Sequence, residues 1–320
     1  MSTQMHAAVL HGIGQTPRYE LFPAPVAGDG ETVITVTAAA LKPSDRWMAR
    51  GLHYAPGRFP QVAGLDGIGT RPDGSRVGFF GLQRPYGGMA EQALVRTGMW
   101  LPVPDGADDV TAAAIMNPGG AAWKTTMVEG QLAAGQTVLI LGATGMSGRI
   151  AAQLAIRHGA RVVVAGRNQR VLDELVARGA DTAIRVDLPR AELADAFAAA
   201  GPYHLVADYL WGPPAESLLA ALMRRGGGPA PELIRYILVG MTAGAEASVP
   251  AIALRAAPVQ LAGSGIGGQA TIEDAAAGFA SVLDLVTAGE ISVDIDAVPL
   301  AEVEKTWDEP DSGRRVVFVP

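Results

Sequence analysis

A glycine-rich turn between a buried strand and a helix constrains the fold of this chain more than any other feature of its sequence. The apolar run Thr137–Leu141 predicts a strand, and the residues from 149 to 158 place their apolar side chains on one face of a helix. Arg161–Ala165 follows as a second strand. This order predicts a βαβ unit in a parallel sheet that helices cover on both faces.

The turn itself has the glycine pattern of a dinucleotide-binding site. Gly142 permits a tight turn, Gly145 lets the backbone approach a pyrophosphate, and Gly148 lets the helix lie close to the strand. The free amides and the dipole at the start of the helix favour an anion there. A purely structural loop stays the alternative. The residues predicted to bind the cofactor here are Gly142, Ala143, Thr144, Gly145, Met146, Ser147 and Gly148.

The end of the second strand favours NADPH over NADH. An NAD site carries an acid at this position to bind the ribose 2′-hydroxyl, and the residues from 165 to 170 include no acid. Arg167 and Arg170 instead offer guanidinium groups to a 2′-phosphate. The alternative is that both arginines are solvated residues at a helix start. The predicted cofactor-binding residues of this segment are Gly166, Arg167, Asn168 and Arg170.

Two further strands are expected at His204–Ala207 and Leu233–Val239, with Asp208 and Gly240 at their carboxyl ends. Open α/β sheets bind ligands at these ends, so a cofactor crevice is expected there. Later segments, including an apolar run near residues 259–262 and a helix at residues 271–287, are predicted to return to the first domain. The first hundred residues contain short extended runs between Gly and Pro, and predict a β-rich domain.

Length and charge set the class of protein. A chain of 320 residues is expected to form two domains. Its net charge of −7, with no basic run, argues against binding to nucleic acid or to an anionic membrane, and favours a small-molecule partner. No signal-like segment precedes the first strand, and no long apolar stretch occurs. The expected location is the cytoplasm.

Several kinds of chemistry are excluded by missing residues. The chain has no cysteine and its histidines have no ligand-pair spacing, so a zinc site is not expected. No lysine has a tyrosine four residues before it, which excludes the short-chain dehydrogenase pattern. A nucleophile elbow and a Walker lysine are also absent. A nucleotide-dependent redox enzyme without a metal remains.

Four segments resemble one known family. Ala40–Asp45, Ala63–Gly69, Tyr86–Glu91 and Gly313–Val317 are similar, in the same order, to motifs of the quinone oxidoreductase branch of the medium-chain dehydrogenase/reductase superfamily, the zinc-free ζ-crystallin-like enzymes. The resemblance covers nearly the whole chain. Lys42 and Val186 depart from the family, because many members have Asn at the first position and several have Tyr beside the 2′-phosphate at the second.

The resemblance implies an α/β architecture in which a Rossmann domain with a doubly wound parallel sheet is inserted into a GroES-like β-barrel catalytic domain. Residues 1–118 and 252–320 would form the catalytic domain, and residues 119–251 the NADPH-binding domain. It also implies a homodimer formed through the edge of the Rossmann sheet. The residues that it places near the nicotinamide are Val239, Gly240, Met241 and Ser264.

The expected activity is NADPH-dependent reduction of quinones or α,β-unsaturated carbonyl compounds by hydride transfer without a metal. Tyr54 is the candidate proton donor, and Lys42 could polarise a substrate carbonyl or hold a cofactor phosphate. A tyrosine that packs at the rim and a solvated loop lysine are the alternatives. Two other functions stay open: a non-catalytic NADPH-binding sensor or structural protein, and an enoyl-thioester reductase.

Overall fold

The chain forms two compact units in the computed structural model, which describes residues 3–52, 58–223, 233–265, 271–310 and 313–320. One unit combines residues 1–117 with residues 279–320, and the other contains residues 118–278. The second boundary therefore differs from the predicted position near residue 252. Strand β14 (Val259–Gly263) pairs in parallel with β13 (Ile234–Leu238), so the expectation that this run returns to the first domain was wrong.

The unit of residues 118–278 contains a six-stranded sheet in the order β11-β10-β9-β12-β13-β14, and each neighbouring pair is parallel. This is the Rossmann strand order, in which the chain builds outward on one side of β9 and then crosses to the other side. The predicted fold class is confirmed. The remaining strands are β9 (Thr137–Leu141), β10 (Arg161–Gly166), β11 (Thr182–Arg185) and β12 (Leu205–Asp208).

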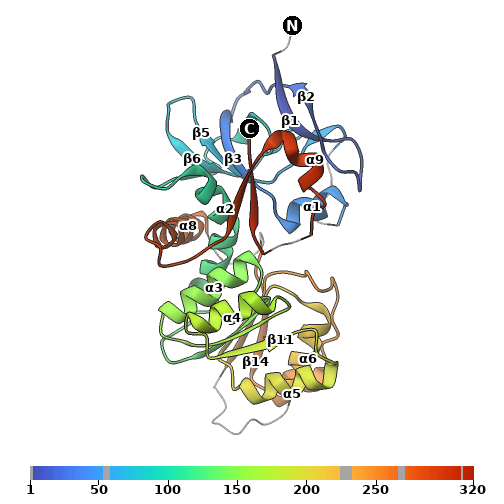
Figure 1. The fold of residues 1–320 in the computed structure, drawn as a ribbon, viewed down its shortest axis with the longest axis vertical. Helices are drawn as coiled ribbons and strands as arrows, with labels where there is room; N and C mark the ends of the chain where they lie inside the picture. Colours follow the sequence, from blue (N-terminus) through green and yellow to red (C-terminus); the bar gives the residue numbers. More distant parts are fainter. Residues whose placement is uncertain (1–2, 53–57, 224–232, 266–270, 311–312) are drawn as a thin grey trace. The chain divides into compact units, whose positions relative to one another are not determined.

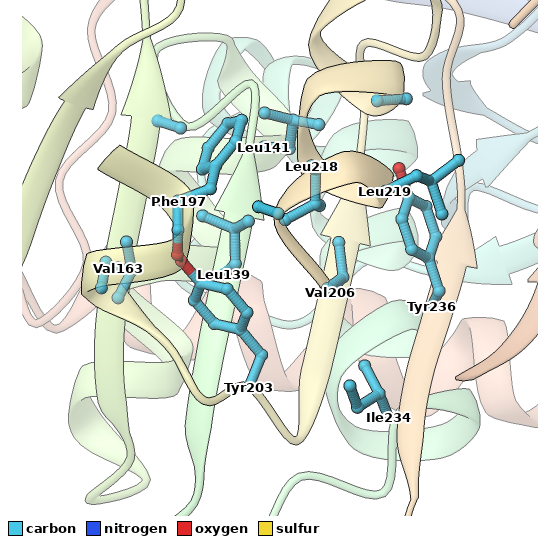
Figure 2. Packing of buried hydrophobic residues seen from close by; sticks show 14 of the residues in the cluster. Leu139, Leu141, Val163, Phe197, Tyr203, Val206, Leu218, Leu219, Ile234 and Tyr236 are labelled. Atoms are coloured by element: carbon cyan, nitrogen blue, oxygen red, sulfur yellow. Dashed lines mark hydrogen bonds between the residues drawn. The ribbon is translucent and has the colours of Figure 1, made fainter. Parts of the chain in front are cut away.

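Helices cover both faces of this sheet (Figure 1). On one face, α3 (Met146–Arg157) and α4 (Gln169–Ala177) pack on the strands, and the predicted apolar face of α3 is buried. On the other face lie α5 (Arg190–Ala200) and α6 (Gly212–Leu222). Figure 2 shows side chains of these two helices meeting strand residues in a hydrophobic core. The labelled core residues are Leu139, Leu141, Val163, Phe197, Tyr203, Val206, Leu218, Leu219, Ile234 and Tyr236.

Further helices flank the strands of this unit along the chain. The long helix α2 (Asp109–Trp123) contains Pro118 and continues into a π-helix, η1 (Lys124–Glu129), and α7 (Ala251–Ala256) precedes β14. Helix α8 (Ile272–Thr287) crosses the boundary between the units. No helix in the described part of the chain is long and apolar enough to span a membrane.

The other unit is rich in β-structure, as predicted, and is built from both chain ends. Its larger sheet has seven strands, and β16 from the C-terminal end pairs antiparallel with β3 from the N-terminal end. This arrangement matches the predicted GroES-like domain. The larger sheet contains β3 (Glu31–Ala40), β5 (Gly67–Thr70), β6 (Arg76–Phe79), β7 (Gln92–Arg96), β8 (Trp100–Pro102), β15 (Ile295–Pro299) and β16 (Arg315–Val319).

A smaller sheet completes this unit, with the strand order β2-β1-β4. Short helices α1 and α9 lie beside the strands, and α9 contacts β2. The elements are β1 (Gln4–Leu10), β2 (Arg18–Pro23), β4 (Gln61–Val62), α1 (Pro43–Ala49), η2 (Leu300–Glu302) and α9 (Val303–Thr306).

Candidate functional site

The glycine turn joins β9 to α3 at the point where the strand order reverses. Gly142 has a φ of +94°, a conformation that side chains disfavour. A Cβ on Gly148 would lie 2.3 Å from the carbonyl oxygen of Gly142, so a glycine is needed for the helix to approach the strand. The amides of Gly142 and Ala143 both donate to the carbonyl oxygen of Ala165, which fixes the turn against β10.

Gly145 differs from the other two glycines because the protein itself does not require it. A Cβ there would meet nothing closer than the carbonyl oxygen of Gly142 at 3.6 Å, and the φ of −84° suits any residue. Gly145 is the N-cap of α3, and no side chain caps the helix. The first amides of a helix have no acceptor within the helix, and the dipole favours an anion. The open space and the uncapped start of α3, at Met146 and Ser147, therefore fit a pyrophosphate.

Thr144 connects this turn to the end of β10. A Cβ on Gly166 would lie 2.4 Å from the Thr144 Cγ2 atom, so the threonine side chain covers the backbone where a larger residue would not fit. Glycine at position 166 is thus explained by packing. The contact also keeps the two predicted cofactor-binding segments beside each other.

The carboxyl ends of β12, β13 and β14 extend this edge of the sheet. Tyr209 lies between two glycines of the site: a Cβ on Gly142 would meet the Tyr209 Cβ at 3.1 Å, and a Cβ on Gly240 would meet the Tyr209 carbonyl oxygen at 2.7 Å. The amide of Ser264 donates to the Leu238 carbonyl oxygen at 2.7 Å. The predicted segments of Val239, Gly240, Met241 and Ser264 therefore share one edge with the glycine turn.

Asp208 holds this part of the edge in place. Its buried carboxylate accepts hydrogen bonds from the Tyr236 hydroxyl at 2.6 Å and from the amides of Leu210 and Trp211 at 2.8 and 2.9 Å. Burial raises the pKa of Asp208, and these hydrogen bonds oppose the rise in part. Trp211 has a φ of +56°, which is uncommon for a large side chain, and the bond to Asp208 stabilises that turn.

Two residues of the segment after β10 form contacts within α4. The side chain of Asn168 caps α4 by accepting from the Val171 amide at 3.4 Å, and Arg170 forms an ion pair with Glu174 one turn later. Arg167 is exposed at the strand end. The parallel pairing places Arg185, at the end of β11, opposite Gly166. A second arginine therefore reaches the position that sequence reasoning gave to Arg167 and Arg170.

In the β-rich unit, Lys42 lies in a buried cluster with two acids. Its Nζ atom is 2.6 Å from Asp66 Oδ1, 3.1 Å from the Ala40 carbonyl oxygen and 3.3 Å from Asp45 Oδ2, and its side chain is 3% exposed. Burial alone would lower the pKa of Lys42, but attraction to Asp45 and Asp66 outweighs it and raises the pKa. An ammonium group has three hydrogens, and three protein acceptors surround this one.

Asp45 ties this cluster to two loops. One carboxylate oxygen accepts from the Lys42 amide at 2.8 Å and the other from the Leu65 amide at 3.0 Å. Asp45 therefore orients the start of α1 through these hydrogen bonds. Tyr54, the candidate proton donor, lies outside the described residues.

Comparison with known proteins gives the same fold over the whole chain. A probable NADPH-dependent quinone reductase of Emericella nidulans is 26% identical over an alignment that covers 99% of this chain and 100% of that one. The quinone oxidoreductase of Sus scrofa is 30% identical over 149 residues, 43% of this chain and 45% of that one. The solved quinone oxidoreductase of Thermus thermophilus, studied also as its complex with NADPH, is 26% identical with a TM-score of 0.78, covering 99% and 100% of the two chains.

The chain is therefore similar over its whole length to an NADPH-dependent quinone reductase, and it shares the fold of a solved quinone oxidoreductase. The family resemblance stated from the motifs is thereby confirmed. No protein-family model matches the sequence.

Two features of the site were missed by sequence reasoning. Arg185 and Asp187 were not singled out, although the family resemblance placed their neighbour Val186 beside the 2′-phosphate, and the pairing of β10 with β11 brings this segment to the site. Tyr209 was also missed. Its position directly after the predicted strand end at Asp208 was the available signal, since residues that follow parallel strands lie at the ligand-binding edge.

Proposed function

We propose that this chain is an NADPH-dependent reductase of quinones or α,β-unsaturated carbonyl compounds that works without a metal. The observation that carries the proposal is the uncapped N-terminus of α3, with open space at Gly145, at the reversal point of a Rossmann sheet. The relatives named as NADPH-dependent or as quinone oxidoreductases support the same activity.

Each part of the nucleotide unit has a role in this proposal. The first amides of α3 bind the pyrophosphate, and Arg167 and Arg185 bind the 2′-phosphate. The ends of β13 and β14, at Gly240 and Ser264, lie beside the nicotinamide. NADPH supplies the hydride, and the protein orients it and excludes water.

The catalytic residues in the β-rich unit remain proposals. Tyr54 is the candidate donor of the final proton. Lys42 is better suited to a positioning role than to contact with substrate, because protein acceptors surround its ammonium group. Lys42 and its acids would hold the segment that leads to Tyr54.

Catalysis without zinc is part of this proposal. It is supported by the sequence, which has no cysteine to hold a zinc ion. A cytoplasmic location remains a prediction.

The activity is tested by following NADPH oxidation with phenanthrenequinone, benzoquinone and a simple enone as acceptors. We expect turnover with at least one of them, and no loss after treatment with a chelator. Binding of NADPH without turnover on any acceptor would favour the sensor or structural protein. Turnover confined to enoyl thioesters would favour the enoyl-thioester reductase.

A homodimer through the edge of the Rossmann sheet is also proposed. Strand β14 is the last strand of the six-stranded sheet, and exposed edge strands readily pair with another chain. Three exposed large apolar residues lie on this strand and on the preceding helix α7: Leu261, Ile252 and Leu254. A second copy that covers them would bury apolar surface.

Replacing Leu261 with arginine is expected to shift the protein from dimer to monomer, because it puts a charge on the covered edge. Light scattering after gel filtration measures the mass. Val176→Arg is the matched control, since Val176 is an exposed apolar residue on α4, away from β14. A wild-type protein with the mass of one chain would contradict the proposed dimer.

A further inference from the structure

Asp187 lies near Arg185 and Arg167 at the carboxyl-end edge of the Rossmann sheet, and the proposed function gives its carboxylate no role. The register of β10 and β11 places Gly166 opposite Arg185, and the Val186 amide donates to the Gly166 carbonyl oxygen at 3.1 Å. The chain then continues to Asp187. An acid that is absent from the segment after β10 is thus brought to the same edge by the next strand.

Asp187 is bound to Arg185 by two hydrogen bonds. The Arg185 Nε atom donates to Asp187 Oδ1 at 2.9 Å, and Nη2 donates to Oδ2. Hydrogen bonds from Arg185 lower the pKa of Asp187, and the positive charge of Arg167 lowers it further. The Asp187 carboxylate is therefore ionised at neutral pH, and the positive charges of Arg185 and Arg167 both attract it. The two side chains of the pair are 39% and 50% exposed, so a ligand can reach them.

We propose that Asp187 sets the preference of this protein between NADPH and NADH by competing with the 2′-phosphate for Arg185 and Arg167. This proposal rests on the proposed function, because it assumes that the nucleotide binds at this edge. A carboxylate and a phosphate engage the same fork of a guanidinium group, so the phosphate must displace Asp187 or bind beside a like charge. NADH has no 2′-phosphate and meets no such competition.

The competing interpretation is that Arg185 and Asp187 form only an exposed surface ion pair. Exposed pairs contribute little to stability, so thermal unfolding does not separate the two interpretations. Nucleotide affinity does, because only competition with the phosphate makes the effect depend on the 2′-phosphate.

The test measures dissociation constants of NADPH and NADH by titration calorimetry. Asp187→Asn is expected to tighten NADPH binding about tenfold at low ionic strength, with a smaller gain in high salt, because Arg185 no longer pairs with a competing carboxylate. NADH affinity should change by less than about threefold, since NADH lacks the 2′-phosphate. The fragments 2′-AMP and 5′-AMP should show the same contrast. In an Arg185→Gln background, most of the gain from Asp187→Asn should disappear.

Asp173→Asn is the matched control, because it removes the same charge from an exposed position on α4, where the carboxylate accepts from Gln169 Nε2 at 2.8 Å. An unchanged NADPH affinity in Asp187→Asn, or an equal gain in Asp173→Asn, would overturn the proposed role of Asp187 and leave the proposed function standing. Failure of the wild-type protein to bind NADPH at all would overturn both.

Discussion

Replacing Lys42 with methionine is expected to lower the free energy of unfolding by about 3–5 kcal/mol near pH 7. The substitution removes the cation that lies 2.6 Å from Asp66 and 3.3 Å from Asp45, and leaves both acids buried without their partner. Guanidinium-induced unfolding, followed by tryptophan fluorescence, measures the change. A loss below about 1 kcal/mol would show that water reaches the cluster.

The loss should depend on pH with a definite sign. Burial raises the pKa of Asp45, and the charge of Lys42 opposes that rise, so the variant raises the pKa of Asp45 further. In the variant, the folded state then binds a proton at a higher pH than the unfolded state does, and stability increases as pH falls. The deficit relative to wild type should be largest near neutral pH and smaller near about pH 5.

Lys305→Met is the matched control for this experiment. Lys305 forms an ion pair with Glu302 at 2.6 Å, the same distance as in the pair of Lys42 and Asp66, but its side chain is 77% exposed. Burial is therefore the main difference between the two pairs. The control should lose no more than about 1 kcal/mol, since water replaces the partner of an exposed charge.

The sequence was most informative where structure is local. The turn at Gly142–Gly148 follows a strand and begins a helix within a few residues, so its conformation and its place in the sheet follow from glycine chemistry and hydrophobic periodicity. Strand β9 has the predicted bounds, Thr137–Leu141. The pairing of β10 with β11 joins segments that are distant in sequence, and Arg185 and Asp187 were missed for that reason.

The burial of polar side chains such as Lys42 could not be predicted from the neighbouring sequence either. A lysine in a loop was expected either to be solvated or to meet a ligand, and the structure surrounds Lys42 with Asp45 and Asp66, which lies 24 residues further along the chain. The domain boundary near residue 252 failed for a related reason. The run Val259–Gly263 reads as a strand in either unit, and only its pairing with β13 assigns it to the Rossmann sheet.

Gly145→Asp is expected to weaken NADPH binding at least ~100-fold without unfolding the protein, because it places a carboxylate where the pyrophosphate is expected. The new side chain has room, since a Cβ at this position meets nothing within 3.6 Å, and the backbone of Gly145 is extended. Aspartate is also a favourable N-cap beside the positive end of the α3 dipole, so the free energy of unfolding should stay the same or rise by a few tenths of a kcal/mol. Calorimetric titration with NADPH and thermal unfolding measure the two effects.

Two variants separate charge from shape in this experiment. Gly145→Asn has almost the same size and also caps helices, so it should bind NADPH more tightly than Gly145→Asp does. Gly148→Ala should instead destabilise the fold. We expect it to lower the free energy of unfolding by about 1–3 kcal/mol, because its Cβ would lie 2.3 Å from the Gly142 carbonyl oxygen. Equal NADPH affinity in Gly145→Asp and wild type would mean that the pyrophosphate does not bind at the start of α3. Packing within the protein does not require glycine at position 145. Another ligand of the first amides of α3 would then be needed to explain that glycine.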